Sequence, residues 1–363
     1  MSQSAPRPYQ NGPYDPLYGG NHLTLIRLIL ASMVVFCHLG TFAKGGTSPD
    51  FFALKMGDLA VNGFFILSGL LIAKSLHAQS GLTAYARSRA LRILPALAVV
   101  TVSLPLFFAP LFSPQGGVSE LYKAENWQYV VRVLTLGDPV TTPGDVFATN
   151  RNTDFNNPLW TVRIEILAYI GAAFIYYTGL ARTPARVLWL TLGISAAYLV
   201  AFNVPNMPGP ASLVELLRLG TCFLIGQLLF YFPRLRQLGW RGAGVGIALW
   251  LLLGPTFVGP VCANLAVAGV VLAAGLPRRA STRVQKIPDY SYGVYIWHAP
   301  ILQSVLFLLP DLGPGPLLVV SAPFILICAA ASWHGIERPA LNWKKPSRAA
   351  WALRRIGQPS KVS

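Results

Sequence analysis

Long stretches without Asp, Glu, Lys or Arg are the feature that most limits what this chain can fold into. Such tracts cover 93–112, 187–214 and 242–277. Each is long enough to cross a bilayer, because one helix needs about 20 apolar residues to span the hydrocarbon core. The last tract has Gly-Pro pairs at 254–255 and 259–260, which predict two spans joined by a tight turn. The chain is therefore predicted to be a multi-pass membrane protein.

The composition supports this class, and the other apolar stretches set the number of spans. Of the 363 residues, 53% are hydrophobic and only 12% are charged, which leaves more apolar surface than a soluble domain can bury. We predict an all-α fold of about ten transmembrane helices within residues 22–340. The predicted spans are 23–42, 58–75, 93–112, 158–178, 187–204, 212–232, 242–256, 260–276, 290–309 and 315–336.

The two ends of the chain are predicted to be tails outside this domain. Residues 1–21 are rich in Pro, Gly, Tyr and Ser and lack the pattern of a signal peptide, so they are predicted to be disordered. Residues 341–363 are predicted to form a basic tail. The four cysteines have no short ligand spacing, so neither a metal site nor a disulfide framework is predicted.

The basic residues predict the orientation in the membrane. Lys and Arg concentrate in alternate connections between spans and at the C-terminal end, whereas the other connections hold few. Because such basic segments face the cytoplasm, both termini are predicted to be cytoplasmic. The net charge of +16 is then explained by topology, without a nucleic-acid partner. The longest outer connection, 113–157, is polar and is predicted to be a soluble loop that could form part of a lid.

Arg27 and His38 in the first span are the first candidate site residues. Charges inside spans are costly, and those that persist usually face a protein interior or a polar cavity. The two residues are separated by about three helical turns, so they share one face and lie about 16 Å apart along the axis. They are predicted to mark two depths of one polar channel. The alternative is that Arg27 extends to the inner surface and that His38 is a hydrogen-bonded core residue.

Glu165 in the fourth span is the next candidate. Arg163 lies two residues earlier and therefore points to the other side of the helix, so it is not a simple partner. Glu165 then needs a partner on another helix, and Arg27 or His38 is the natural candidate. A buried structural ion pair is the alternative.

Two further patterns concern helix faces. Ser291, Tyr295 and His298 fall at i, i+4 and i+7 and predict one polar stripe on the ninth span. His298 is expected to support the site by hydrogen bonding, although it could also carry a proton. Glu215 and Arg218, three apart, are predicted to form a structural pair. Glu337, which Arg338 follows, is predicted to lie at the inner surface with local charge pairing.

Arg89 and Arg92 precede the third predicted span. At this spacing they are neighbours on a helix face at the cytoplasmic surface. Guanidinium groups bind phosphate oxygens bidentately, so this pair could hold a phosphate. Binding of lipid headgroups or a role as a topology signal is the alternative, which the spacing alone favours.

Taken together, the order and spacing of these segments resemble the acyltransferase-3 family of bacterial integral membrane O-acyltransferases. The resemblance covers residues 22–340 and is to members without an appended soluble hydrolase-like domain. Its motifs are Arg27-x10-His38, AVNGFFILSGLLI, RALRILP, LWTVRIEILAYI, SYGVYIWH and IERP. The chain departs from many members at Asn62, where they carry Asp, and at Thr161, where they carry Ser.

The resemblance implies transfer of an acyl group, usually acetyl from acetyl-CoA, to a sugar hydroxyl of a cell-envelope or exported glycan or glycolipid. Acetyl-CoA would be a donor substrate, with no bound cofactor, and the enzyme would lie in the bacterial inner membrane. Membrane lipids and envelope polysaccharide assembly proteins are further candidate partners.

The resemblance also assigns roles to individual residues. His38 is expected to be the general base, because a histidine titrates near neutral pH. Glu165 would orient it or stabilise its protonated form, and Arg27 would stabilise negative charge on the donor or the oxyanion. Arg89 and Arg92 would bind the phosphates of the donor. The expected substrate or support residues are Asn62, Ser68, Trp160, Tyr295 and His298.

Two other functions fit part of the pattern. In a proton-coupled transporter or flippase, the same buried groups would relay protons or bind a headgroup. Such proteins often contain repeated halves, and the sequence shows no repeat. A scaffold for envelope assembly would leave the charges inside the spans unexplained.

Overall fold

The computed structural model describes residues 17–18, 20–45, 50–51, 54–79, 81–139, 142–204 and 211–343, and they are mostly helical. Seven helical segments within this part of the chain are long and apolar enough to cross a membrane. They are α1 (Leu23–Lys44), α2 (Met56–Ala78), α3 (Leu82–Ser103) with its continuation to Phe112, α6 (Leu159–Tyr177), α7 (Pro184–Asn203), α8 (Ala211–Tyr231) and α14 (Pro314–Ser332) with its continuation to Asn342.

Three further helices complete the bundle. The shorter apolar helices α10 (Trp240–Leu253) and α11 (Gly259–Gly275) form the predicted hairpin, and α13 (Ser291–Leu308) packs against α1 and α14. A Cβ atom on Gly259 would lie 2.1 Å from the backbone oxygen of Gly254, so this turn requires glycine. The prediction of an all-α, multi-pass membrane protein with about ten spans is confirmed.

The third span differs from its predicted bounds. Helix α3 begins at Leu82, eleven residues before the predicted start, and continues through the π-helical turn η1 (Leu104–Phe108) and α4 (Ala109–Phe112). No Gly or Pro interrupts the chain from Leu82 to Ile93, so the basic segment joins the helix. Arg89 and Arg92 therefore lie on a membrane helix and not in a preceding loop.

The outer connection is also more ordered than predicted. It contains the 3-10 turn η2 (Val118–Tyr122) and α5 (Ala124–Leu134), and Tyr129, Phe147 and Phe155 are buried beneath them. These aromatic side chains belong to the main hydrophobic core of the bundle and hold the connection against it, because large rings remove much apolar area from water. The described loop before α2 holds one short hairpin of β1 (Asp50–Phe51) and β2 (Leu54–Lys55).

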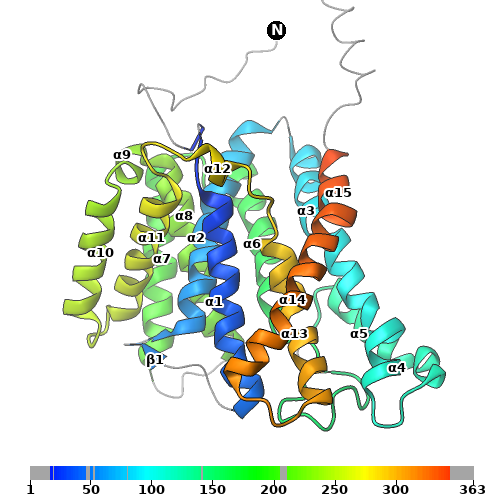
Figure 1. Ribbon diagram of the computed structural model, residues 1–363. Helices are drawn as coiled ribbons and strands as arrows, with labels where there is room; N and C mark the ends of the chain where they lie inside the picture. Colours follow the sequence, from blue (N-terminus) through cyan, green and yellow to red (C-terminus); the bar gives the residue numbers. More distant parts are fainter. Residues whose placement is uncertain are drawn as a thin grey trace, which may run out of the picture.

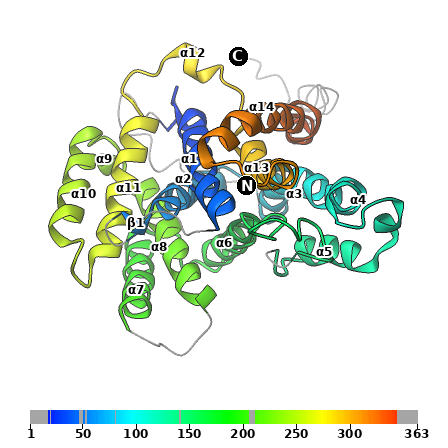
Figure 2. The same cartoon turned by 60° about the horizontal axis from the view of Figure 1, so that its bottom comes forward.

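The helices pack around α1 and α2 (Figures 1 and 2). Helix α2 packs extensively against α8, and α1 contacts both α2 and α13. A Cβ atom on Gly69 would lie 1.9 Å from the backbone oxygen of Phe223, and one on Gly226 would lie 2.0 Å from that of Ile66. These glycines let α2 and α8 approach closely, as small residues do in membrane bundles.

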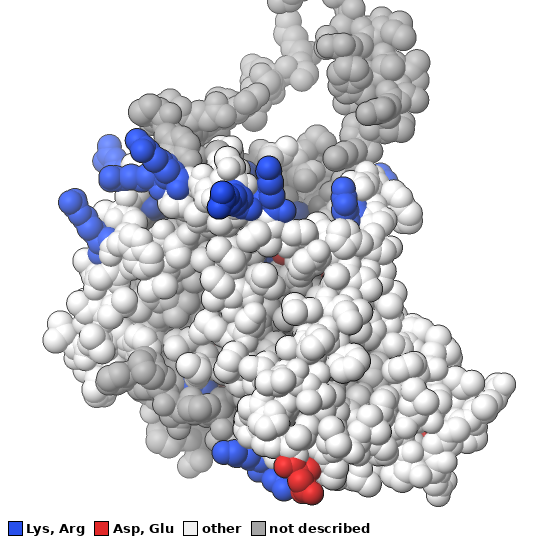
Figure 3. Space-filling model, in the orientation of Figure 1, with Lys and Arg blue, Asp and Glu red and all other residues white. Residues whose placement is uncertain are grey.

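Basic side chains mark one face of the molecule. Figure 3 shows most of the visible Lys and Arg side chains along the edge at which α1 begins and the last helix, α15 (Arg338–Asn342), ends. The predicted tails, 1–21 and 341–363, lie largely outside the described residues. Of the first tail, Leu17 is buried, and Lys74 donates a hydrogen bond to its backbone oxygen at 2.7 Å.

Candidate active site

A cavity of about 370 Å³ lies in the half of the bundle near the start of α1. Its walls come from α1, α2, α3, α6, α13 and the end of the chain around α15. Most of the predicted site residues line it, namely Arg27, Ser68, Arg89, Arg92, Glu165 and Tyr295. The cavity therefore brings together residues that are far apart in the sequence.

Arg27 and Arg92 meet at a carboxylate that the sequence analysis missed. Nη1 of Arg27 and Nη2 of Arg92 each donate to Oδ2 of Asp289 at 2.7 Å. The hydroxyl of Ser291 donates to the other carboxylate oxygen of Asp289 at 2.6 Å. Burial would raise the pKa of Asp289, but the guanidinium groups of Arg27 and Arg92 outweigh it and lower the pKa to about 2. Asp289 is therefore ionised at neutral pH and neutralises part of the cavity charge.

Glu337 is the second counter-ion of Arg92. Its Oε2 accepts from Nη1 of Arg92 at 3.4 Å, and its Oε1 accepts from Ser332 at 3.0 Å. The prediction that Glu337 pairs locally at the inner surface is wrong, because its side chain is 1% exposed and faces α3. It ends a π-helical turn, η3 (Trp333–Glu337), and such turns re-aim side chains within a helix.

Glu165 does not bond to either predicted partner. Its Oε1 accepts from Ser68 at 3.0 Å and from the hydroxyl of Tyr169. The expectation that its partner is Arg27 or His38 is wrong, because its hydrogen bonds go to Ser68 on α2 and Tyr169 on α6 instead. Its role in catalysis stays a prediction. Arg163 is exposed, so the prediction that it points away from Glu165 is confirmed.

His38 forms a pair with His298. Nδ1 of His38 lies 2.8 Å from Nε2 of His298, and the rings stack with centroids 5.0 Å apart. Nδ1 of His298 lies 2.7 Å from the carbonyl oxygen of Tyr295, which can only accept. For two neutral rings, Nδ1 of His298 carries its proton, Nε2 of His298 accepts from His38, and Nε2 of His38 keeps a lone pair. The hydrogen-bond network thus assigns His38 the tautomer of a base.

The polar stripe of α13 connects the cavity with this pair. Ser291 and Tyr295 line the cavity, and the ring of Tyr295 lies edge-on to His298 with centroids 6.0 Å apart. The hydroxyl of Tyr295 hydrogen-bonds Thr161 at 2.5 Å, so the Thr at this position makes a direct contact. Among the described residues, His38 and His298 do not line the cavity itself.

Two predicted support residues lie elsewhere. Asn62 is buried in a separate cluster, where it donates to Asn264 at 2.8 Å and accepts from Arg218. Arg218 also binds Glu215, as the spacing predicted, and Asp58 at 3.2 Å. Trp160 packs against the hydrophobic core and not on the cavity wall.

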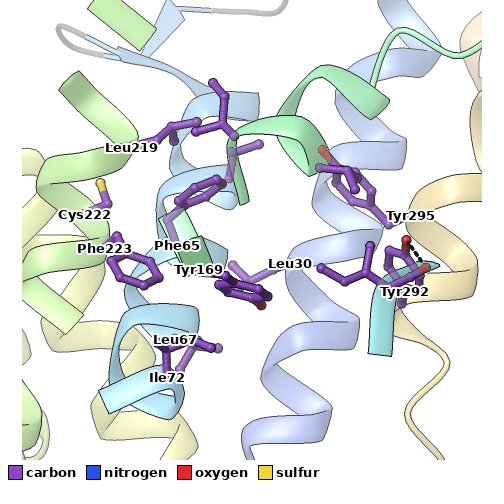
Figure 4. Close-up of a cluster of buried hydrophobic side chains, with 14 of the residues drawn as sticks. Leu30, Phe65, Leu67, Ile72, Tyr169, Leu219, Cys222, Phe223, Tyr292 and Tyr295 are labelled. Atoms are coloured by element: carbon purple, nitrogen blue, oxygen red, sulfur yellow. Dashed lines mark hydrogen bonds between the residues drawn. The ribbon is translucent and has the colours of Figure 1, made fainter. Parts of the chain in front are cut away.

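Aromatic side chains close the cavity against the core. Figure 4 shows Phe65, Tyr169 and Phe223 gathered in the middle of the bundle, with Tyr292 and Tyr295 on the side of α13. Tyr292 donates to the backbone oxygen of Ile93 at 3.2 Å. Within the described ranges, no group of three His, Cys, Asp or Glu residues could hold a metal ion.

Comparisons with known proteins find relatives that match most of the chain. The chain is 26% identical to the O-acetyl transferase of Shigella phage Sf6, over 91% of this chain and 98% of that protein. It is 26% identical to nodulation protein 10 of Rhizobium leguminosarum bv. viciae, over 89% of this chain and 93% of that protein. It is 24% identical to the peptidoglycan O-acetyltransferase OatA of Listeria monocytogenes, over 86% of this chain and 54% of that protein. No solved structure matches significantly.

The family model gives the broadest match. The acyltransferase-3 model, described as an acyltransferase domain, matches residues 21–334. That range contains the ten helices, the histidine pair and all of the residues that line the cavity except Leu341. The predictions of the family and of an acyltransferase are confirmed, and the chain belongs to the acyltransferase-3 family.

Proposed function

We propose that the protein is an O-acetyltransferase that moves an acetyl group from acetyl-CoA to a sugar hydroxyl of a cell-envelope or exported glycan or glycolipid. The proposal rests on a cavity that contains several arginines and on His38, whose Nε2 has an available lone pair. One face of α13 connects the two. Two of the relatives bear the name of an O-acetyl transferase, which supports the acetyl group and the hydroxyl acceptor.

His38 is the base in this proposal. Its Nε2 takes the proton of the acceptor hydroxyl while the oxygen attacks the thioester carbonyl. The carbon–sulfur bond then breaks, and the thiolate of coenzyme A takes a proton from the imidazolium. His298 is a positioning residue, because its hydrogen bond fixes the tautomer of His38.

The cavity holds the donor. Its cations suit the phosphates of coenzyme A, which should not enter hydrocarbon. Arg89 hydrogen-bonds only the hydroxyl of Ser88, at 3.1 Å, and no carboxylate in the described part of the chain pairs with it. Arg27 lies beside Asp289 about 16 Å along the axis from His38, so its role is to bind the donor and not the oxyanion.

The orientation follows from the donor. Coenzyme A is cytoplasmic, so the face with the cavity and most basic side chains is the cytoplasmic face of a bacterial inner membrane. Both termini would lie on that side, and the acceptor would approach His38 from the outer side. An alkaline phosphatase fused after Lys361 should be inactive; activity outside the cell would reverse the orientation.

The test of the function is mass spectrometry of envelope glycans from cells with and without the gene. We expect a mass gain of one acetyl group per modified sugar only in cells that carry the gene. Purified protein should also release free thiol from acetyl-CoA when it is given an extract of those glycans. A flippase would show neither result, so identical glycans together with no thiol release would contradict the proposal.

A further inference from the structure

One oxygen atom of Asp289 holds two arginines from two different helices. Its Oδ2 accepts from Arg27 on α1 and from Arg92 on α3, both at 2.7 Å. Phosphate oxygens can be bound in the same way, because guanidinium N–H groups donate strong hydrogen bonds to phosphate as well as to carboxylate oxygens. The carboxylate of Asp289 thus occupies a position suited to a phosphate.

The two counter-ions of Arg92 differ in how they are held. Asp289 lies in the loop before α13, lines the cavity and is 14% exposed. Glu337 lies inside a helical turn, is 1% exposed, is also held by Ser332 and does not line the cavity. The carboxylate of Asp289 therefore has space on the cavity side into which it can turn, whereas that of Glu337 is enclosed.

We infer that Asp289 is a displaceable counter-ion: its carboxylate fills the anion position between Arg27 and Arg92 while the site is empty, and a phosphate group of the donor replaces it there. The inference rests on the proposed function, in which a nucleotide-bearing acyl donor enters this cavity. Glu337 keeps Arg92 in place throughout.

The exchange of Asp289 for a phosphate group would help the enzyme to bind the donor and to release the product in each catalytic cycle. Without Asp289, Arg92 would keep only Glu337, and Arg27 would lose the carboxylate that it binds. Uncompensated charge is costly inside a membrane protein, so the empty site needs a negative group. When the donor arrives, one anion replaces another and the net charge near the arginines changes little. When the product coenzyme A leaves, Asp289 returns, which limits how tightly the product is held.

The test is binding of coenzyme A to the full-length protein in lipid nanodiscs, measured by calorimetry. Asp289→Asn removes the competing charge and should lower the dissociation constant about tenfold, the effect typical of one nearby charge. Asp289→Glu keeps a carboxylate and should bind nearly as the wild type does. Asp311→Asn is the matched control, because it makes the same change at an exposed position between α13 and α14, and it should have no effect.

A second variant covers the case in which Asp289→Asn does not fold. Ser291→Ala removes the hydroxyl that holds Asp289 at 2.6 Å, so displacement should become easier and the dissociation constant should fall about two- to threefold. Weaker or unchanged binding in folded Asp289→Asn would overturn the inference alone and leave the donor site standing. If that variant is unfolded, unchanged binding in Ser291→Ala decides against the inference. No binding of coenzyme A to the wild type would overturn both the inference and the proposed donor.

Discussion

The cavity and the histidine pair handle polarity inside the membrane in different ways. In the cavity, full charges persist because carboxylates neutralise two of the arginines at 2.7–3.4 Å. In the histidine pair, two rings hydrogen-bond each other and a backbone carbonyl, and the pair needs no counter-ion. Under the proposed function, charge gathers where an ionic donor would enter, and a neutral histidine lies where a proton would have to be removed.

Under the proposed function, this division would separate donor binding from chemistry along one face of α13. Changes in the cavity should act mainly on the Michaelis constant of the donor. Changes in the histidine pair should act mainly on the turnover number. Variants in each region can test whether the two effects are separable.

Replacement of the base should have the largest effect. His38→Ala should lower the turnover number by about 10²–10⁴-fold, the usual contribution of a general base. The Michaelis constant for acetyl-CoA should change little, because His38 does not line the cavity. Steady-state kinetics on purified protein, with equal amounts of inserted protein, checks this. A normal turnover number would remove His38 from the chemistry.

Replacement of the positioning histidine should cost less. His298→Leu removes the acceptor that fixes the tautomer of His38, and loss of such an orienting bond typically costs about 10–100-fold in activity. His298→Gln offers a carbonyl oxygen as an acceptor and should recover part of the rate. If His298→Leu were more harmful than His38→Ala, the base would have been assigned to the wrong helix.

Replacement of Arg89 and Arg92 tests the role of the cavity. The double change Arg89→Gln and Arg92→Gln should raise the Michaelis constant of acetyl-CoA about tenfold or more, because charged hydrogen bonds to phosphate are lost. The constant for the acceptor should stay nearly unchanged. Arg87→Gln is the control, since Arg87 is exposed and its one hydrogen bond within the described residues goes to the backbone oxygen of Trp343. An unchanged donor constant in the double variant would return the pair to the role of a topology signal.

Glu165 should behave as a cavity residue. Glu165→Gln keeps an oxygen that can accept from Ser68 and Tyr169, so the turnover number should fall less than about tenfold. The turnover number of this variant therefore also tests the sequence prediction that Glu165 orients His38. A loss as large as that of His38→Ala would mean that Glu165 does act on the base.

The smallest effect concerns pH. Because the pKa of Asp289 is lowered to about 2, its carboxylate stays ionised at higher pH, and its contribution is lost only as the pH falls towards that value. The ratio of dissociation constants for coenzyme A between wild type and Asp289→Asn should therefore be the same at pH 5 and pH 8. A ratio that shrinks towards pH 5 would show that the carboxylate is protonated there.

Much of the fold could be predicted because a membrane span can be recognised from the local composition of about 20 residues. Uncharged tracts and turn residues gave the ten helices, including the hairpin at 254–260. The early start of α3 was missed because its first turns are basic and resemble a loop. The burial of the connection 113–157 against the main core was missed because Tyr129, Phe147 and Phe155 are scattered along a polar segment.

Most of the predicted site residues line the cavity, but the sequence did not predict which of them form hydrogen bonds or ion pairs with one another. Helical spacing placed Tyr295 and His298 on one face and turned Arg163 away from Glu165. The partners of Arg27 and His38 lie 262 and 260 residues away, and no local pattern reports such distances. Asp289 could have been suspected as an acid directly before a polar stripe. Asn62 was assigned to the site by resemblance, whereas its buried neighbours place it in the cluster of Arg218.

The proposed function is tested most directly by measuring from which side of the membrane the cavity can be reached. Ser68 lines the cavity, so Ser68→Cys in a protein whose four native cysteines are replaced by alanine reports on access. A membrane-impermeant maleimide should label this cysteine in inside-out membrane vesicles and not in right-side-out vesicles, and coenzyme A should slow the labelling. Labelling from the outer side only, or labelling that coenzyme A does not affect, would contradict a cytoplasmic donor cavity beneath the histidine pair.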